Sequence, residues 1–141
     1  MASINPYLNF SGNCEEAFEF YRSVLGGEID IQRFSDVPAD VPSQEPEGGD
    51  KVMHVALPMA NGQMLMGSDR PATMGPTTPG DNVQINVRPD SSEEARRIFD
   101  GLAEGGQITM PYEQAFWGAE FGMLTDRFGI NWMVNYDSEA G

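Results

Sequence analysis

The chain is 141 residues long, a length that suits one domain with a buried core. It has 22 acidic and 8 basic residues, which gives a formal net charge of −14. This balance excludes nucleic acid and anionic membranes as expected partners, because both are bound through clustered lysine and arginine.

Cysteine content and hydropathy indicate the compartment. Cys14 is the single cysteine, so no internal disulfide can form. No apolar run is long enough to span a membrane, and the first residues lack the charged and apolar regions of a signal peptide. We therefore expect a cytoplasmic protein.

The first half of the chain predicts a strand, a helix and three more strands. The first strand covers 3–10. The helix begins after Asn13, an N-cap candidate with Glu16 three residues on, and ends at the glycine pair 26–27. Its apolar stripe contains Cys14, Ala17, Phe18, Tyr21 and Leu25. The later strands are predicted at 28–34, 52–58 and 63–68, the last two joined by a turn at Asn61-Gly62.

The second half repeats this order. A strand at 83–87 precedes a helix that begins after Ser91, with Glu94 completing a capping box. A strand at 107–112 leads to a closing hairpin over 116–136, with its turn at Asp126–Gly129. Trp117 and Trp132 both fall in this hairpin, and one interpretation makes both of them core aromatics.

Two segments lack the pattern of a helix or strand. Residues 36–50 are rich in proline and glycine, and they are either a disordered excursion or a lid over a pocket. Residues 69–81 have a similar composition. We expect one domain over 1–141, divided into module one at 1–70, a linker at 71–81 and module two at 82–141.

The two halves also agree in register. Moving the first half forward by 78 residues places Glu16 on Glu94 and Ala17 on Ala95, and it also aligns the two glycine stops. The helix caps, the apolar stripes and the terminating glycines all align at this one shift. Their joint alignment indicates a structural repeat, although the sequence identity between the two halves is low.

The closing hairpin resembles that of the vicinal oxygen chelate superfamily, which includes glyoxalase I, bleomycin-resistance proteins and extradiol dioxygenases. The run FWxxxFGxxTDxFGxxWMxN over 116–135 is closer still to the PhnB-like branch. The resemblance implies an α+β fold in which two βαβββ modules form a curved eight-stranded sheet around a cavity. It also implies a homodimer.

In metal-binding members of that superfamily, His and Glu side chains on the first and last strand of each module hold a divalent metal. Carried over to this sequence, the positions are Asn5, Asn82, Met133 and a fourth near Leu65 or Met66. Amide and thioether side chains do not replace imidazole and carboxylate ligands. We therefore predict no metal site and no cofactor, although the superfamily makes a divalent metal possible.

Cavity residues follow from the same resemblance. The predicted lining includes Asn5, Tyr7, His54, Met66, Asn82, Trp117 and Met133. His54, the one histidine, is either a hydrogen-bonded strand residue or a general base, since imidazole exchanges protons near neutral pH. Asp69 either orients His54 or begins the linker.

Two functions are compatible with these residues. The first is a binding protein that holds a small molecule in a metal-free cavity. The alternative is a small-molecule isomerase or lyase of the vicinal oxygen chelate superfamily, with or without a metal, and with His54 as its candidate catalytic residue. No glycine-rich nucleotide turn is visible, so the methyltransferase label once given to the PhnB-like branch has no support in the residues.

Overall fold

A computed structural model describes residues 2, 4–36, 51–71 and 74–137 of the chain. Contacts within the chain divide it into two compact units, Met1–Thr78 and Pro79–Gly141. The division falls inside the predicted linker, 71–81. The predicted lid or disordered excursion lies outside the described residues, apart from its first residue, Asp36.

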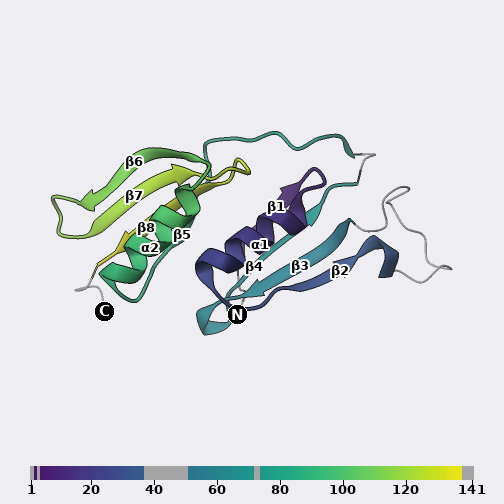
Figure 1. Ribbon diagram of the computed structural model, residues 1–141, viewed down its shortest axis with the longest axis horizontal. Helices are drawn as coiled ribbons and strands as arrows, with labels where there is room; N and C mark the ends of the chain where they lie inside the picture. The colour runs from purple at the N-terminus through teal and green to yellow at the C-terminus, as the bar shows by residue number, and fades with distance from the viewer. Residues whose placement is uncertain (1, 3, 37–50, 72–73, 138–141) are drawn as a thin grey trace. The chain divides into compact units, whose positions relative to one another are not determined.

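The first unit contains one helix and a four-stranded sheet (Figure 1). Its elements are β1 (Tyr7–Phe10), α1 (Cys14–Leu25), β2 (Asp30–Arg33), β3 (Val52–Pro58) and β4 (Met64–Asp69), with short 3-10 helices at Phe34–Asp36 and Ala60–Gly62. The strand order is β1-β4-β3-β2. β1 runs parallel to β4, and the other neighbours are antiparallel.

Helix α1 packs on β3 and β4 through an apolar stripe. Its buried residues are Cys14, Ala17, Phe18, Tyr21 and Val24, so Val24 takes the place predicted for Leu25. The Phe18 ring approaches β4 at Gly67, where an added Cβ would come within 2.8 Å of the ring. The absence of a side chain at Gly67 therefore sets how closely helix and sheet pack.

The predicted cap of α1 is wrong in its chemistry. Asn13 precedes the helix but makes no side-chain cap hydrogen bond. The carboxylate of Asp69, at the end of β4, accepts from the backbone amides of Gly12 and Cys14 instead. Because the capping residue is 55 positions from Cys14 in sequence, no local sequence pattern could predict it.

The hairpin at Asn61-Gly62 is confirmed as an antiparallel pairing of β3 with β4. The connection is longer than the expected two-residue turn, because it contains a turn of 3-10 helix over Ala60–Gly62. Gly62 has a φ of 76°, the positive value that favours glycine at this position.

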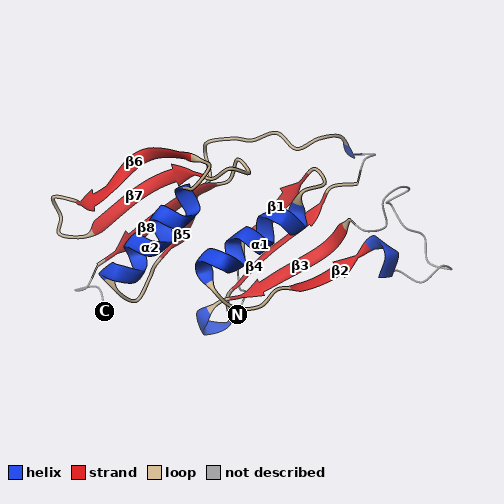
Figure 2. Cartoon of the chain, in the orientation of Figure 1, coloured by secondary structure: helices blue, strands red, loops and turns tan. Residues whose placement is uncertain are grey.

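The second unit also contains one helix and a four-stranded sheet. Its elements are β5 (Ile85–Val87), α2 (Ser92–Ala103), β6 (Gln107–Gln114), β7 (Glu120–Thr125) and β8 (Asn131–Tyr136). The strand order is β5-β8-β7-β6, with β5 parallel to β8. Figure 2 shows the alternation of strands and helix along each unit.

Helix α2 begins as predicted. The Ser91 hydroxyl accepts from the backbone amide of Glu94 over 3.1 Å. The Glu94 carboxylate accepts from the backbone amide of Asp90, whereas in a capping box it would accept from the amide of the N-cap residue, Ser91. Both contacts join residues only a few positions apart, so the local sequence pattern of a capped helix could predict the start of α2.

The closing hairpin is partly confirmed. Its turn is at the predicted place, where the Gly129 amide donates to the Asp126 carbonyl and Gly129 has a φ of 88°. Trp132, in β8, is 1% exposed and belongs to the core. Residues 116–119 are not part of a strand, contrary to the prediction, because they form the turn between β6 and β7. Trp117 is therefore not a core residue and is 55% exposed.

The predicted α+β class and the two βαβββ modules are confirmed. Each module has its own four-stranded sheet with one helix, and neither sheet closes into a barrel. Each helix has 12 residues, and within the described part of the chain neither has the length and apolarity needed to cross a membrane.

Candidate functional site

Three of the predicted site residues lie together on the first sheet, on the face that α1 leaves uncovered. Side chains alternate between the faces of a strand, so Leu65 and Gly67 face the helix and Met66 faces away. Tyr7 pairs with Met66 in the register of β1 and β4. His54 lies two residues from Ala56, the partner of Met66 on β3.

Tyr7 and His54 form a side-chain pair on this face. The Tyr7 hydroxyl lies 3.4 Å from Nδ1 of His54, and the ring centroids are 5.8 Å apart. Tyr7 is 44% exposed, so the pair is open to solvent. The sequence predicted both residues as lining but did not pair them, because they are 47 positions apart.

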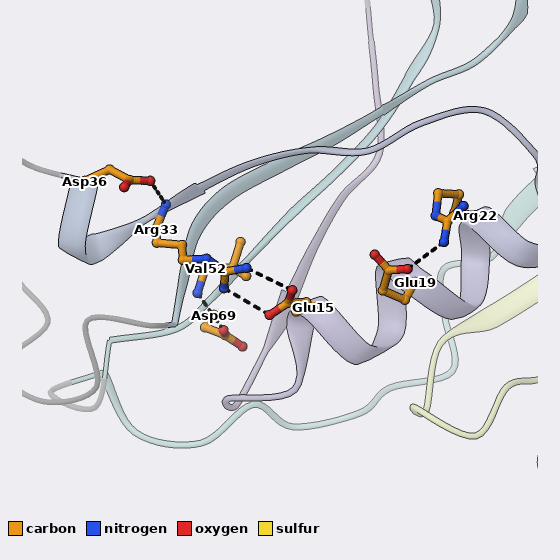
Figure 3. Close-up of polar contacts among 7 residues, drawn as sticks. All are labelled: Glu15, Glu19, Arg22, Arg33, Asp36, Val52 and Asp69. Carbon is orange, nitrogen blue, oxygen red and sulfur yellow. Dashed lines mark hydrogen bonds and ion pairs between the residues drawn. The ribbon is translucent and has the colours of Figure 1, made fainter.

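Asp69 is neither the orienting partner of His54 nor a linker residue. Besides the amides of Gly12 and Cys14, it accepts from the amide of Val52 over 2.9 Å, a contact drawn in Figure 3. Asp69 is 3% exposed. The carboxylate therefore joins β3, β4 and the start of α1, which is a structural role.

Cys14 is fully buried beside this carboxylate, which confirms its predicted role in packing. Burial raises the pKa of the Cys14 thiol, and the charges of Asp69 and Glu15 raise it further. A thiol held in its neutral form is a poor nucleophile and a poor metal ligand.

The positions that hold metal in the superfamily do not fit a metal here. The Oδ1 atom of Asn5 accepts from the Met64 amide over 3.1 Å, which joins the chain before β1 to β4. Asn82 is exposed in the segment before β5. Met133 offers only a thioether. Among the described residues, no group of three His, Cys, Asp or Glu side chains lies close enough to hold a metal ion.

The second unit has a small open pocket on the face of its sheet that α2 leaves uncovered. Its volume is about 170 Å³. The lining residues are Asn86, Arg88, Trp117, Ala119, Asn135 and Asp137. Asn135 alternates with the core residues Trp132 and Val134 on β8, which places it on this face. Of the predicted residues, Trp117 lines the pocket, and Met133 pairs with Asn86 on the same face.

Trp117 is the aromatic residue that lines this pocket, and two other aromatic rings lie beside it. The Trp117 ring lies 5.7 Å from that of Phe121 on β7, and the nearly perpendicular Phe116 ring is 5.0 Å away. The turn between β6 and β7 holds Trp117 in place, because the Ala115 amide donates to the Ala119 carbonyl over 2.7 Å. The half-exposed indole thus offers a face on which a flat ligand can stack.

Asn135 contributes an unsatisfied acceptor. Its Oδ1 atom is buried and has no hydrogen-bond partner among the described residues. Buried polar atoms in folded proteins are nearly always hydrogen-bonded, so an unpaired one in a pocket indicates a place for a donor. The sequence analysis missed Asn135, although it is the last residue of the quoted hairpin motif.

Asn86, Arg88 and Asp137 were also missed. The sequence did contain a signal for Arg88 and Asn86, because they alternate with apolar Ile85 and Val87 on the polar side of the predicted strand. Nothing in the sequence marked Asp137.

The family described as 3-demethylubiquinone-9 3-methyltransferase matches residues 2–135 of the chain. Protein YjdN of Escherichia coli (strain K12) is 32% identical over 144 residues, covering 94% of this chain and 93% of that protein. Protein PA1353 from Pseudomonas aeruginosa has a crystal structure with a TM-score of 0.84. It is 42% identical, over 97% of this chain and 98% of that one.

A solved structure of the putative 3-demethylubiquinone-9 3-methyltransferase PhnB from Bacillus cereus has a TM-score of 0.73. It is 30% identical, covering 96% of this chain and 99% of that one. A glyoxalase/bleomycin resistance protein from Albidiferax ferrireducens T118, 15% identical over 95% of this chain and 98% of that one, has a TM-score of 0.60 and shows the fold alone. The chain therefore belongs to the PhnB-like family described as 3-demethylubiquinone-9 3-methyltransferase, within the glyoxalase/bleomycin resistance/dioxygenase fold.

Proposed function

We propose that this protein binds a small, flat organic molecule in the pocket of its second unit, without a metal. The observation that carries the proposal is that Asn135, which has a buried and unpaired Oδ1 atom, lines the same pocket as the exposed Trp117 indole. The Asn135 oxygen can accept a hydrogen bond from a donor on the ligand, and the Trp117 indole can stack on a planar ring of the ligand. The proposed binding function rests on these two contacts.

The energies favour a ligand with both features. An unsatisfied buried acceptor costs about 1–3 kcal/mol, and a ligand N–H or O–H that reaches it removes that cost. Stacking on an aromatic side chain contributes about 0.5–1.5 kcal/mol beyond the burial of apolar area. Because the pocket holds only about 170 Å³, we expect a ligand with a single ring.

Binding of matched one-ring aromatic amides and acids, followed by isothermal titration calorimetry, tests the proposal. Suitable probes are 4-aminobenzamide, 4-hydroxybenzamide, 4-aminobenzoate and 4-hydroxybenzoate. We expect at least one to bind, and Trp117→Ala to weaken its binding about tenfold. Phe116→Ala is the matched control, because Phe116 is an adjacent aromatic, 97% exposed, that does not line the pocket. Absence of binding by every probe, or equal losses in both variants, would contradict the proposal.

Native mass spectrometry of the untagged protein gives an independent test. A co-purified mass below the size of a two-ring compound would support a one-ring ligand. The same spectra report the number of subunits, and so they also test the predicted homodimer.

The pair of Tyr7 and His54 favours a second candidate, an isomerase or lyase. A hydroxyl beside an imidazole can pass a proton to and from a substrate, and the two groups are 3.4 Å apart on an open sheet face. Deuterium incorporation into small α-hydroxy ketones in D₂O, followed by proton NMR, tests this candidate. We expect exchange that is lost in His54→Gln, and equal exchange in both proteins would exclude His54 as the base.

A further inference from the structure

Arg88 differs from the other basic residues of this acidic protein. The chain has 8 lysines and arginines and 22 acidic residues, so acidic side chains that could pair with a basic one are abundant. Arg22, Arg33 and Arg97 form ion pairs with glutamates. Lys51, Arg70 and Arg127 donate to backbone carbonyls, and Arg96 lies over the Tyr112 ring.

Among the residues that the structure describes, Arg88 alone of these eight has no such partner. It lines the same pocket as Trp117 and Asn135. A guanidinium presents a planar fork of N–H donors that matches a carboxylate with two parallel hydrogen bonds. A guanidinium that has no such partner among the described residues, and that lines a pocket, is suited to an anionic group on a ligand.

Asp137 limits which anion fits. Its carboxylate also lines the pocket and would repel a second negative charge placed beside it. The acceptor Oδ1 of Asn135 likewise does not favour an anion. Asn135 instead favours an N–H or O–H donor. The pocket therefore combines a position for an anion with a position for a donor.

The overall charge of −14 does not rule out an anionic ligand. Repulsion from distant surface charges is screened beyond about 8 Å at physiological ionic strength. The contact with Arg88 is short-range and is not screened in this way. The surface charge therefore slows the approach of an anion, while Arg88 determines how firmly it is held.

We propose that the ligand of this pocket is a one-ring aromatic carboxylate that also carries an N–H or O–H donor, an inference that rests on the proposed function. The carboxylate binds Arg88, the ring stacks on Trp117, and the donor reaches Asn135. Amino- and hydroxy-substituted aromatic acids belong to this class.

Matched acid and amide pairs test the inference: 4-aminobenzoate with 4-aminobenzamide, and 4-hydroxybenzoate with 4-hydroxybenzamide. Members of a pair have nearly the same shape and differ in charge. We expect each acid to bind at least about tenfold more tightly than its amide, as measured by isothermal titration calorimetry. Arg88→Gln should remove this preference, chiefly by weakening the binding of the acid.

Arg22→Gln is the matched control, because it makes the same change in net charge on α1, outside the pocket. It should keep the preference for the acid. Amides that bind as tightly as acids, or a preference that persists in Arg88→Gln, would overturn the inference while leaving the proposed function in place. If no probe binds at all, the proposed function itself fails.

Discussion

The carboxylate of Asp69 accepts a hydrogen bond from the backbone amide of Cys14 over 3.0 Å, so the last residue of β4 caps helix α1. The same oxygen accepts from Gly12, and the other oxygen accepts from Val52. One buried side chain thus satisfies three backbone donors from two separate segments. The arrangement fixes the helix on the sheet of the first unit.

Asp69→Ala should therefore strongly destabilise the first unit. The substitution leaves the amides of Gly12, Cys14 and Val52 without their acceptor, and we expect the free energy of unfolding to fall by about 2–5 kcal/mol. Urea denaturation followed by circular dichroism measures the change. Asp100→Ala, an exposed acid on α2, should shift stability by less than about 0.5 kcal/mol. Equal effects of the two substitutions would rule out the structural role of Asp69.

Asn135→Leu should have the opposite effect. It replaces a buried, unpaired acceptor with an apolar side chain of similar size, and we expect stability to rise by about 1 kcal/mol. The comparison is Asn131→Leu on the same strand, which should be destabilising. Asn131 bonds to Thr125 Oγ1 and to the Gly80 carbonyl. Thermal unfolding of both variants checks the prediction, and a lower melting temperature for Asn135→Leu would contradict it.

Gly106→Ala should disrupt the second unit. An added Cβ would overlap the carbonyl oxygen of Thr125 and lie 2.9 Å from the backbone of Asp126, and backbone atoms there have no rotamer to change. We expect a loss of about 3 kcal/mol. Gly80→Ala is the control, because its nearest neighbour would be 3.9 Å away. The two are compared by thermal denaturation, and similar melting temperatures would show that the backbone at Gly106 adapts.

Cys14 should be unreactive in the folded protein. Complete burial blocks access, and the raised pKa of the thiol keeps it in the protonated form. With Ellman's reagent at pH 8, we expect labelling at least about a hundredfold slower than in 6 M urea. Rapid labelling of one thiol per chain without denaturant would mean that α1 opens readily from its sheet.

The pair of Glu15 and Arg33 predicts a dependence of stability on pH. The hydrogen bond from Arg33 lowers the pKa of Glu15 below its usual 4.5 (Figure 3). A lowered folded-state pKa means that the stabilisation is present above pH 4.5 and is lost as the pH falls through the folded-state value. Both side chains are partly exposed, so the contribution is about 0.2–1 kcal/mol.

Glu15→Gln should accordingly be less stable than wild type at pH 7, and the difference should shrink towards pH 3. Glu16→Gln, also in the first turn of α1, controls for the general effect of an acid near the helix N-terminus. Urea denaturation at several pH values measures both. A difference for Glu15→Gln that stays constant with pH would exclude the ion pair as its cause.

The elements whose signals are local could be predicted from the sequence. The cap of α2 at Ser91, the glycine stop at Gly26 and the turn at Asp126–Gly129 depend on residues a few positions apart. The apolar stripes of both helices followed from spacing alone. With the closing hairpin motif, these signals were enough for the fold class and the family.

The features that join residues far apart in sequence depend on the tertiary structure and could not be predicted. Trp117 and Trp132 have the same aromatic, apolar neighbours in sequence, yet a turn exposes Trp117 and the sheet buries Trp132. The cap from Asp69, the pairing of Tyr7 with His54 and the unpaired oxygen of Asn135 depend on strand register. Register is fixed when whole faces of the sheets pack against the helices, and no short stretch of sequence contains that information.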